Sequence, residues 1–157
     1  MEIERKFLIK QLPFTLEQFE MTEIEQMYLS TEPVVRIRKK GDKYYLTCKS
    51  KGMMERQEAE FPISKLVYEE LKLQKQGNII TKKRYIIPYQ TYQIELDQFE
   101  GDFCGLILAE VEFASKEEAE AFVMPDWFLK DVTFEKEYHN SNLSKVEIEE
   151  FKKFMAR

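Results

Sequence analysis

The chain has 157 residues, which suits one domain with a sizeable core and leaves little room for two. Hydrophobic residues make up 43% and aromatic residues 13%, as in a globular protein, while charged residues reach 34%, above the usual fraction of about a quarter. The 24 Lys and Arg against 29 Asp and Glu give a net charge of −5, which does not suggest a general affinity for nucleic acid or anionic membranes but allows a local basic site.

The sequence carries no sign of export or membrane insertion. No apolar run approaches the ~20 residues needed to span a bilayer, and the charged N-terminus lacks the apolar stretch of a signal peptide. Cys48 and Cys104 belong to no CxxC pair or disulfide-rich pattern. We therefore expect a cytoplasmic protein with free thiols.

Segments in which polar and apolar residues alternate, separated by turn-like clusters, predict nine β-strands. In chain order they cover residues 1–9, 23–30, 33–40, 43–50, 54–61, 78–88, 91–99, 106–114 and 131–138. Gly41 and Asp42 lie between two of these segments and predict a turn that joins antiparallel neighbours.

Three further segments repeat apolar residues at helical spacing. They cover residues 64–74, 115–122 and 144–157. Ser64, Ser115 and Ser144 stand at their starts as expected N-caps, and Glu118 and Glu147 follow the last two as in a capping box. The third helix carries a broad apolar stripe, typical of a helix that covers a sheet, formed by Val146, Ile148, Phe151, Phe154 and Met155.

Charged residues occupy one face of most predicted strands. In the opening MEIERKFLIK, Glu2, Glu4 and Lys6 share a face, because side chains two apart in a strand point to the same side. Later strands repeat this alternation, and the full set contains eight bases and eight acids. The bases are Lys6, Arg36, Arg38, Lys49, Arg56, Lys82, Arg84 and Lys136, and the acids are Glu2, Glu4, Glu58, Glu60, Glu95, Asp97, Glu110 and Glu112.

Strand faces that point into water also carry charges, and surface ion pairs contribute only ~0–1 kcal/mol each. However, like charges are adjacent within strands here, as in the Arg36 and Arg38 pair, whereas solubility alone favours mixed signs. Paired carboxylates suit a divalent cation, and converging bases suit a polyphosphate. A metal-bound polyphosphate inside a barrel would satisfy both, with the three helices covering the apolar outer face.

The Glu2-x-Glu4-x-Lys6 pattern resembles the signature of the CYTH superfamily, or triphosphate tunnel metalloenzymes. The chain is similar to the short bacterial members over essentially its whole length, through EQMYLS, Arg36-x-Arg38, LTCKS, RQEAE, Lys82-x-Arg84, IELDQFEG, LAEVEF and DVTFEKEYHNSNLS. The resemblance implies an α+β fold in one domain of residues 1–157: an eight-stranded antiparallel β-barrel that forms a tunnel with a charged lumen, with helices packed outside. One of the nine predicted strands is then superfluous or lies outside the barrel.

The resemblance also implies roles for individual residues. Those that resemble the metal-binding glutamates, for Mg²⁺ or Mn²⁺, are Glu2, Glu4, Glu110 and Glu112. Those that resemble phosphate-binding bases are Lys6, Arg36, Arg38, Lys49, Lys82 and Arg84, and Arg56 and Lys136 on matching strands complete the substrate-binding set. Glu58, Glu60, Glu95 and Asp97 match tunnel-lining strands without a defined role. The residues expected to be catalytic are Glu4, Lys6, Lys82 and Glu112.

Among the activities of this superfamily, the short chain is most similar to members that hydrolyse inorganic tripolyphosphate to pyrophosphate and phosphate. The bases would hold the triphosphate while water attacks the terminal phosphorus in line, activated by a second metal or by Glu4, Glu58 or Glu112. The expected partner is therefore a small-molecule triphosphate, with neither nucleic acid nor membrane, and a homodimer is compatible with the sequence.

Other functions remain compatible with the sequence. The same scaffold serves class IV adenylate cyclases and organic triphosphatases that act on nucleoside or thiamine triphosphates. A noncatalytic polyphosphate-binding module and a β-rich domain with charged outer faces are alternatives of another class. The chain has a single histidine, His139, which excludes a His-rich zinc site. We expect His139 at the surface or in loop packing. Tyr28 is a candidate for the tunnel wall, with less support than the charged residues.

Overall fold

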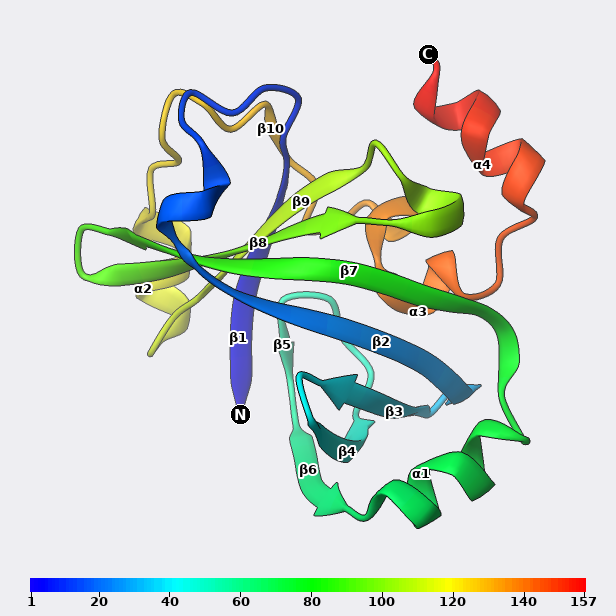
Figure 1. Cartoon of the computed structure of the whole chain (residues 1–157). Coiled ribbons are helices and arrows are strands. Elements are labelled where there is room, and N and C mark those ends of the chain that lie inside the picture. The colour runs from blue at the N-terminus through cyan, green and yellow to red at the C-terminus, as the bar shows by residue number, and fades with distance from the viewer.

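The alternating segments fold into antiparallel strands that curl into an almost closed barrel in the computed structural model, which describes residues 1–157 (Figure 1). The strands are β1 (Glu2–Leu8), β2 (Glu20–Thr31), β3 (Val34–Lys40), β4 (Lys43–Lys49), β5 (Glu55–Arg56), β6 (Glu58–Ile63), β7 (Gln76–Tyr89), β8 (Tyr92–Phe99), β9 (Ile107–Glu112) and β10 (Lys130–Asp131). The helices are α1 (Lys65–Lys72), α2 (Lys116–Ala121), α3 (Asn140–Leu143) and α4 (Ile148–Met155). Three short 3₁₀ helices cover Leu16–Gln18, Gly101–Phe103 and Lys136–Tyr138.

The barrel closes through a strand that is interrupted at Gln57. The sheet runs in the order β10-β1-β9-β8-β7-β2-β3-β4-β6, and β5, one residue before β6, pairs with β1. Because β5 and β6 act as one strand that contacts β1 at one end and β4 at the other, the ring has eight strands, and β10 lies outside it. The expected eight-stranded antiparallel barrel is confirmed, with the strand left over placed at its edge.

The last predicted strand, residues 131–138, is wrong. Only Lys130–Asp131 pairs with β1, and a 3₁₀ helix follows at Lys136–Tyr138. The Asp131 side chain accepts a hydrogen bond from the backbone N–H of Thr133 at 2.8 Å, a local turn that competes with strand pairing. This segment therefore folds across the barrel instead of joining its wall.

Two of the three predicted helix starts are confirmed. The Ser64 hydroxyl accepts from the Val67 N–H at 3.1 Å, and Ser115 accepts from Glu118 at 3.2 Å. The third start is wrong, because Ser144 is buried and donates its hydroxyl to the Ser141 carbonyl oxygen at 2.6 Å. The side chain of Glu147 caps α4 in its place, and the short α3 precedes it.

The hydrophobic core lies outside the barrel, between its wall and the helices. One cluster joins Phe7 of β1 and Leu96 of β8 to residues around α2, a second is covered by Phe151 of α4, and a third by Tyr68 of α1. The apolar stripe of α4 therefore packs as predicted. Since the outward faces are apolar, the alternate side chains of each strand point into the barrel.

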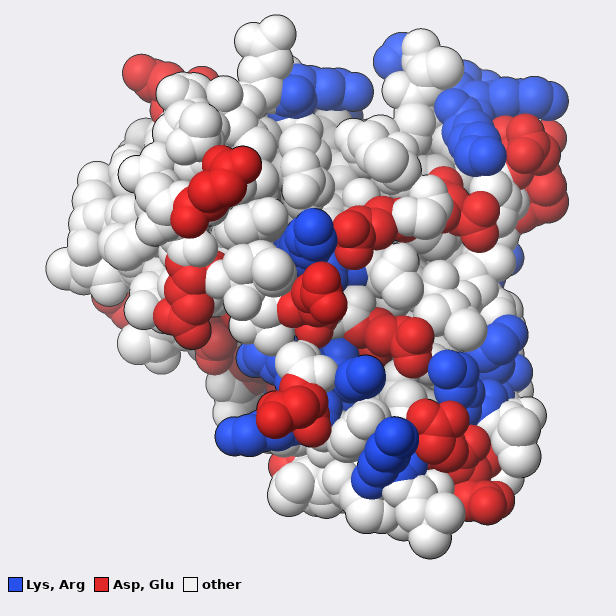
Figure 2. Space-filling model, in the orientation of Figure 1, with Lys and Arg blue, Asp and Glu red and all other residues white.

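Charges on the outer surface are mixed. Figure 2 shows acidic and basic side chains interspersed on one face of the molecule, without a large patch of one sign. None of the helices is both long enough and apolar enough to cross a membrane.

Candidate functional site

The barrel encloses a cavity whose wall is almost entirely polar. It is lined by 19 residues, of which only Tyr28 and Val34 are hydrophobic. The charged lining residues are Glu2, Glu4, Lys6, Arg36, Arg38, Lys40, Lys49, Arg56, Glu58, Lys82, Arg84, Glu95, Glu110 and Glu112. The structure thus brings together every predicted metal-binding glutamate and every predicted substrate-binding base except Lys136.

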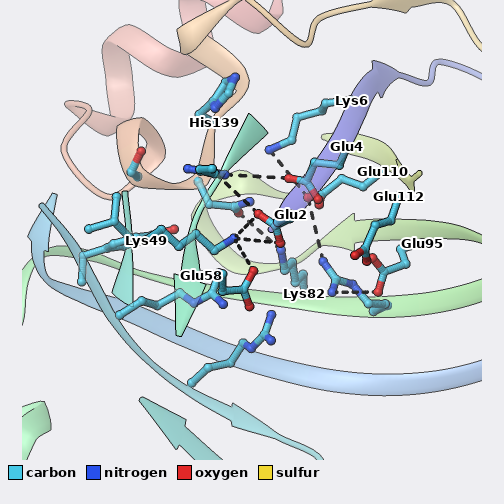
Figure 3. A pocket seen from close by; sticks show the side chains of 18 of the residues that line it. Glu2, Glu4, Lys6, Lys49, Glu58, Lys82, Glu95, Glu110, Glu112 and His139 are labelled. Atoms are coloured by element: carbon cyan, nitrogen blue, oxygen red, sulfur yellow. Dashed lines mark hydrogen bonds and ion pairs between the residues drawn. The ribbon is translucent and has the colours of Figure 1, made fainter. Parts of the chain in front are cut away.

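Strand pairing separates the charges into two walls. Antiparallel register places Glu4 opposite Glu112 and Lys6 opposite Glu110, which gathers carboxylates along β1 and β9. The strands β3 and β7 carry two arginines and a lysine-arginine pair respectively, and β2 lies between them. In Figure 3 the glutamates and the bases point toward one another across the cavity. The like charges adjacent along each strand therefore have their counter-charges on other strands.

The bases are deeply buried. Burial and the neighbouring Arg36 and Arg84 lower the pKa of Arg38 to about 10. Burial lowers the pKa of Lys82 to about 8, although Asp97 acts in the opposite direction. The Nε atoms of Arg36, Arg38 and Arg56 are buried without a hydrogen-bond partner. Buried N–H donors without a hydrogen-bond partner favour binding of a multivalent anion.

The carboxylates are unequally neutralised. Burial together with Glu110 and Glu2 raises the pKa of Glu4 well above its usual range. A hydrogen bond with Glu2, together with burial, raises the pKa of Glu58 to about 7. Burial opposes ionisation of Glu110, but Lys6 and Arg84 hold its pKa well below the usual value. Carboxylates that crowd one another in this way favour a nearby cation.

The donor set fits a hard divalent cation that is shared with a ligand. No three His, Cys, Asp or Glu side chains are gathered closely enough to hold a metal ion by themselves. Mg²⁺ is typically held by one or two carboxylates together with waters and phosphate oxygens, so a pair such as Glu4 and Glu110 is sufficient. The glutamates of β1 and β9 are the residues that would hold such an ion.

Two acidic residues on the predicted tunnel face do not line the cavity, namely Glu60 and Asp97. Asp97 does not line the cavity; its carboxylate lies 2.6 Å from Lys82 Nζ and accepts from Arg84 Nε at 2.8 Å and Nη2 at 2.9 Å. Glu60 also lies outside the lining and accepts from Arg38 Nη2 at 3.3 Å. Asp97 is buried together with the bases it contacts, whereas Glu60 is exposed.

The C-terminal segment differs from the prediction in two ways. Lys136 is exposed on a 3₁₀ helix and does not line the cavity, because the strand expected there does not form. His139, expected at the surface or in loop packing, lines the cavity together with Asn140 and Ser141. Its Nε2 lies 2.8 Å from the Thr133 carbonyl oxygen, and burial and Lys6 lower its pKa to about 4.

Besides His139, the sequence did not identify four lining residues, which are Val34, Lys40, Asn140 and Ser141. Asn140 Oδ1 lies 3.4 Å from Lys82 Nζ, which ties this segment to the β7 wall. Lys40 ends β3 on the same face as Arg36 and Arg38, so alternation extended by one step identifies it. For Asn140 the polar run YHNSN was the only signal in the sequence.

Comparisons with known proteins agree with this geometry. The CYTH domain family matches residues 1–148. An inorganic triphosphatase of Nitrosomonas europaea is 38% identical over 147 residues, which cover 91% of this chain and 96% of the relative. An inorganic triphosphatase of Acetivibrio thermocellus is 32% identical over 155 residues, which cover 96% of this chain and 97% of the relative. The crystal structure of an inorganic triphosphatase superimposes with a TM-score of 0.70 at 35% identity and covers 94% of this chain and 96% of that one.

Proposed function

Since this chain belongs to the CYTH family, we propose that it is a metal-dependent triphosphatase that hydrolyses inorganic tripolyphosphate to pyrophosphate and phosphate. The observation that carries the proposal is the polar cavity, in which buried bases on β3 and β7 face glutamates on β1 and β9. A condensed phosphate would satisfy the bases, and a divalent cation held by the glutamates would offset their mutual repulsion. The relatives named as inorganic triphosphatases support this choice of substrate.

In this proposal the bases bind and orient the substrate. Arg36, Arg38 and Arg84 present planar guanidinium groups that suit phosphate oxygens, and Lys6 and Lys82 add compact charges. Because these groups are buried, their interaction with developing negative charge is stronger than it would be in water. Holding the three phosphates in an extended line leaves the terminal phosphorus open to in-line attack.

The glutamates would hold the metal and water. Mg²⁺ or Mn²⁺, when bound, would supply positive charge to the phosphate oxygens and would make water a better nucleophile. Glu2, Glu4, Glu110 and Glu112, which all line the cavity, are the proposed ligands, and either Glu4 or Glu112 is proposed to accept the proton of the attacking water. Glu58, with its pKa raised to about 7, is a third group suited to accept that proton near neutral pH.

Phosphate release tests the proposal directly. Purified protein is assayed with tripolyphosphate and Mg²⁺, Mn²⁺ or EDTA, with ATP and pyrophosphate as comparison substrates. We expect turnover that needs metal, favours tripolyphosphate and leaves pyrophosphate intact. Turnover that persists in EDTA would contradict the metal requirement, and cyclic AMP with pyrophosphate formed from ATP would identify a cyclase.

No observation favours the nucleotide-based alternatives. An adenine or thiazolium ring needs an apolar or stacking surface, and the cavity offers Tyr28 and Val34 as its only hydrophobic lining residues. We further propose that residues 1–157 work as one domain, because the barrel and the segment carrying His139 line the same cavity.

A further inference from the structure

A second depression adjoins one side of the cavity. The two share the lining residues Val34, Arg56, His139 and Ser141, so they are continuous. Three connecting segments converge there: the β2–β3 turn, the β4–β5 loop and the chain around α3. We call this depression the vestibule.

The vestibule is strongly basic. Its charged lining residues are Lys51, Arg56, Lys136 and Lys145 against the single acid Glu32. The three lysines are exposed and take part in no ion pair, unlike Lys83 and Lys130, which pair with Glu100 and Glu135. Arg56 pairs with Glu2 and Glu4, so the positive charge without an ion-pair partner is that of the three lysines, in a chain whose net charge is −5.

The depression that adjoins the cavity at Glu95 and Glu112 has the opposite character. These two glutamates are its only charged lining residues. In Figure 3 they lie close together and apart from His139, which lines the vestibule. A polyanion is attracted at the vestibule and repelled at the glutamates.

We propose that the vestibule is a second anion-binding site, which captures condensed phosphate from solution and directs it into the barrel from this side. The inference rests on the proposed function for the identity of the anion, and it assigns to Lys51, Lys136 and Lys145 a role in capture and not in chemistry. Focused charge at a cleft raises association rates by about 10- to 1,000-fold at low salt, and screening removes most of this gain at high salt.

Charge reversal tests the proposal. The double variant Lys136→Glu/Lys145→Glu changes the charge by −4, two units at each position. Lys10→Glu/Lys65→Glu is the matched control: it has the same charge change on exposed lysines that line neither the cavity nor its two adjoining depressions. The measurements are kcat/KM and kcat for tripolyphosphate across a salt series, and calorimetric binding of tripolyphosphate in EDTA.

We expect the vestibule variant to lose about tenfold in kcat/KM and in affinity at about 20 mM salt, and to approach the wild type at about 500 mM. The control should lose far less, and kcat should change far less than kcat/KM. Lys51→Glu should show a smaller loss of the same kind. Equal losses of kcat/KM in the two double variants, or a loss that salt does not reduce, would contradict the proposal that the vestibule captures the anion.

The binding measurement separates this inference from the proposed function. If the wild type binds tripolyphosphate without turning it over, the hydrolase proposal fails, and a loss of binding confined to the vestibule variant still supports the capture site. If the wild type turns over normally and the two double variants bind alike, the capture site fails alone. If the wild type did not bind tripolyphosphate at low salt, the proposed capture site would also be contradicted.

Discussion

Asp97 forms ion pairs with two bases of the cavity wall, Lys82 and Arg84. Its carboxylate is 1% exposed and contacts Lys82 at 2.6 Å and Arg84 through two hydrogen bonds. One carboxylate thereby contacts two bases, of which Arg84 also pairs with Glu95 at 3.2 Å and with Glu110 at 3.9 Å. The function of Asp97 is positional, since it fixes where the two cations lie without lining the cavity itself.

Replacing Asp97→Asn keeps the shape of the side chain and removes the charge. Lys82 then loses its only ion-pair partner, while Arg84 keeps Glu95 and Glu110, and we expect the free energy of unfolding to fall by about 3 kcal/mol in urea titration. Asp97 raises the pKa of Lys82, which is about 8 even in its presence. Without it, Lys82 should lose its proton at lower pH, so the alkaline rise in KM for tripolyphosphate should move to lower pH.

Asp131→Asn is the matched control. Asp131 pairs with Arg5 at 2.7 Å on the outside of the barrel, where it is 36% exposed, and such pairs contribute about 0–1 kcal/mol. We expect a small loss of stability and an unchanged pH profile of KM. Asp97 would have no special role if the two variants behaved alike in both measurements.

Glu112 tests the assignment of the carboxylate wall. Burial and the neighbouring Glu2 and Glu95 raise its pKa, so the ionised side chain is repelled in the absence of a cation. Glu112→Gln removes that repulsion, and the melting temperature should stay the same or rise. Phosphate release should nevertheless fall by about 100-fold or more, as expected when a metal ligand or proton acceptor is lost. A variant with full activity would contradict the proposed role.

Alternation along the strands predicts which side chains face the lumen, but not how deep they lie. Glu95 and Asp97 are two residues apart on the same face of β8, and nothing in the sequence distinguishes them. Antiparallel register places Asp97 opposite Arg84, and its short side chain is covered by Arg84 and Lys82. The difference between a lining group and a supporting one therefore depends on pairing between strands.

At the scale of elements, the segment after β10 is where prediction from the sequence fails. FEKEY alternates like a strand, but the local hydrogen bonds of Asp131 and Thr133 turn the chain before it can pair. Residues around α3 then cross to the barrel, where the Asn78 amide donates to the carbonyl oxygens of Leu143 and Val146, both at 2.9 Å. These contacts join residues far apart in sequence, so the spacing of polar and apolar residues cannot predict them.

His139 makes the docking of this segment sensitive to pH. Burial lowers its pKa from 6.5 to about 4, so it is neutral in the folded protein at pH 5 while the unfolded chain is mostly protonated. The unfolded state then binds more protons, and this contribution to stability is present above pH 6.5 and is lost as pH falls toward 4. With allowance for solvent screening of a partly exposed group, the loss between pH 7 and 5 should be about 1 kcal/mol.

His139→Gln isolates this contribution, because the acidic residues titrate alike in both proteins. We expect the variant to lose less stability than the wild type between pH 7 and pH 5 in urea unfolding, by about 1 kcal/mol. Parallel pH dependences for the two proteins would show that the imidazole does not stay neutral on folding. Thermal unfolding at the same two pH values provides an independent check.

At the scale of the whole molecule, the fold is an inverted barrel, with hydrophobic packing outside and charge inside. The helices α1, α2 and α4 cover apolar clusters on the outer wall, which leaves the interior free to hold charges that a hydrophobic core would not tolerate. The sequence shows this inversion, because strands with one charged face occur together with amphipathic helices sufficient to cover the other. The closure of the ring through β5 and β6 could not be predicted from the sequence, because it depends on pairing between β5 and β1.

An interior built of opposed charges should be stabilised by its ligand more than by any change at the surface. A ligand at about 100 times its dissociation constant adds about 2.7 kcal/mol to the stability of the folded state, which corresponds to a rise of roughly 5–10 °C in melting temperature for a chain of this size. We expect tripolyphosphate with Mg²⁺ to produce this rise and EDTA to reduce it. Sodium sulfate at matched ionic strength is the control, because it screens charge without bridging the two walls. If sulfate alone raised the melting temperature as much, general screening would account for the effect and the walls would hold no specific condensed phosphate.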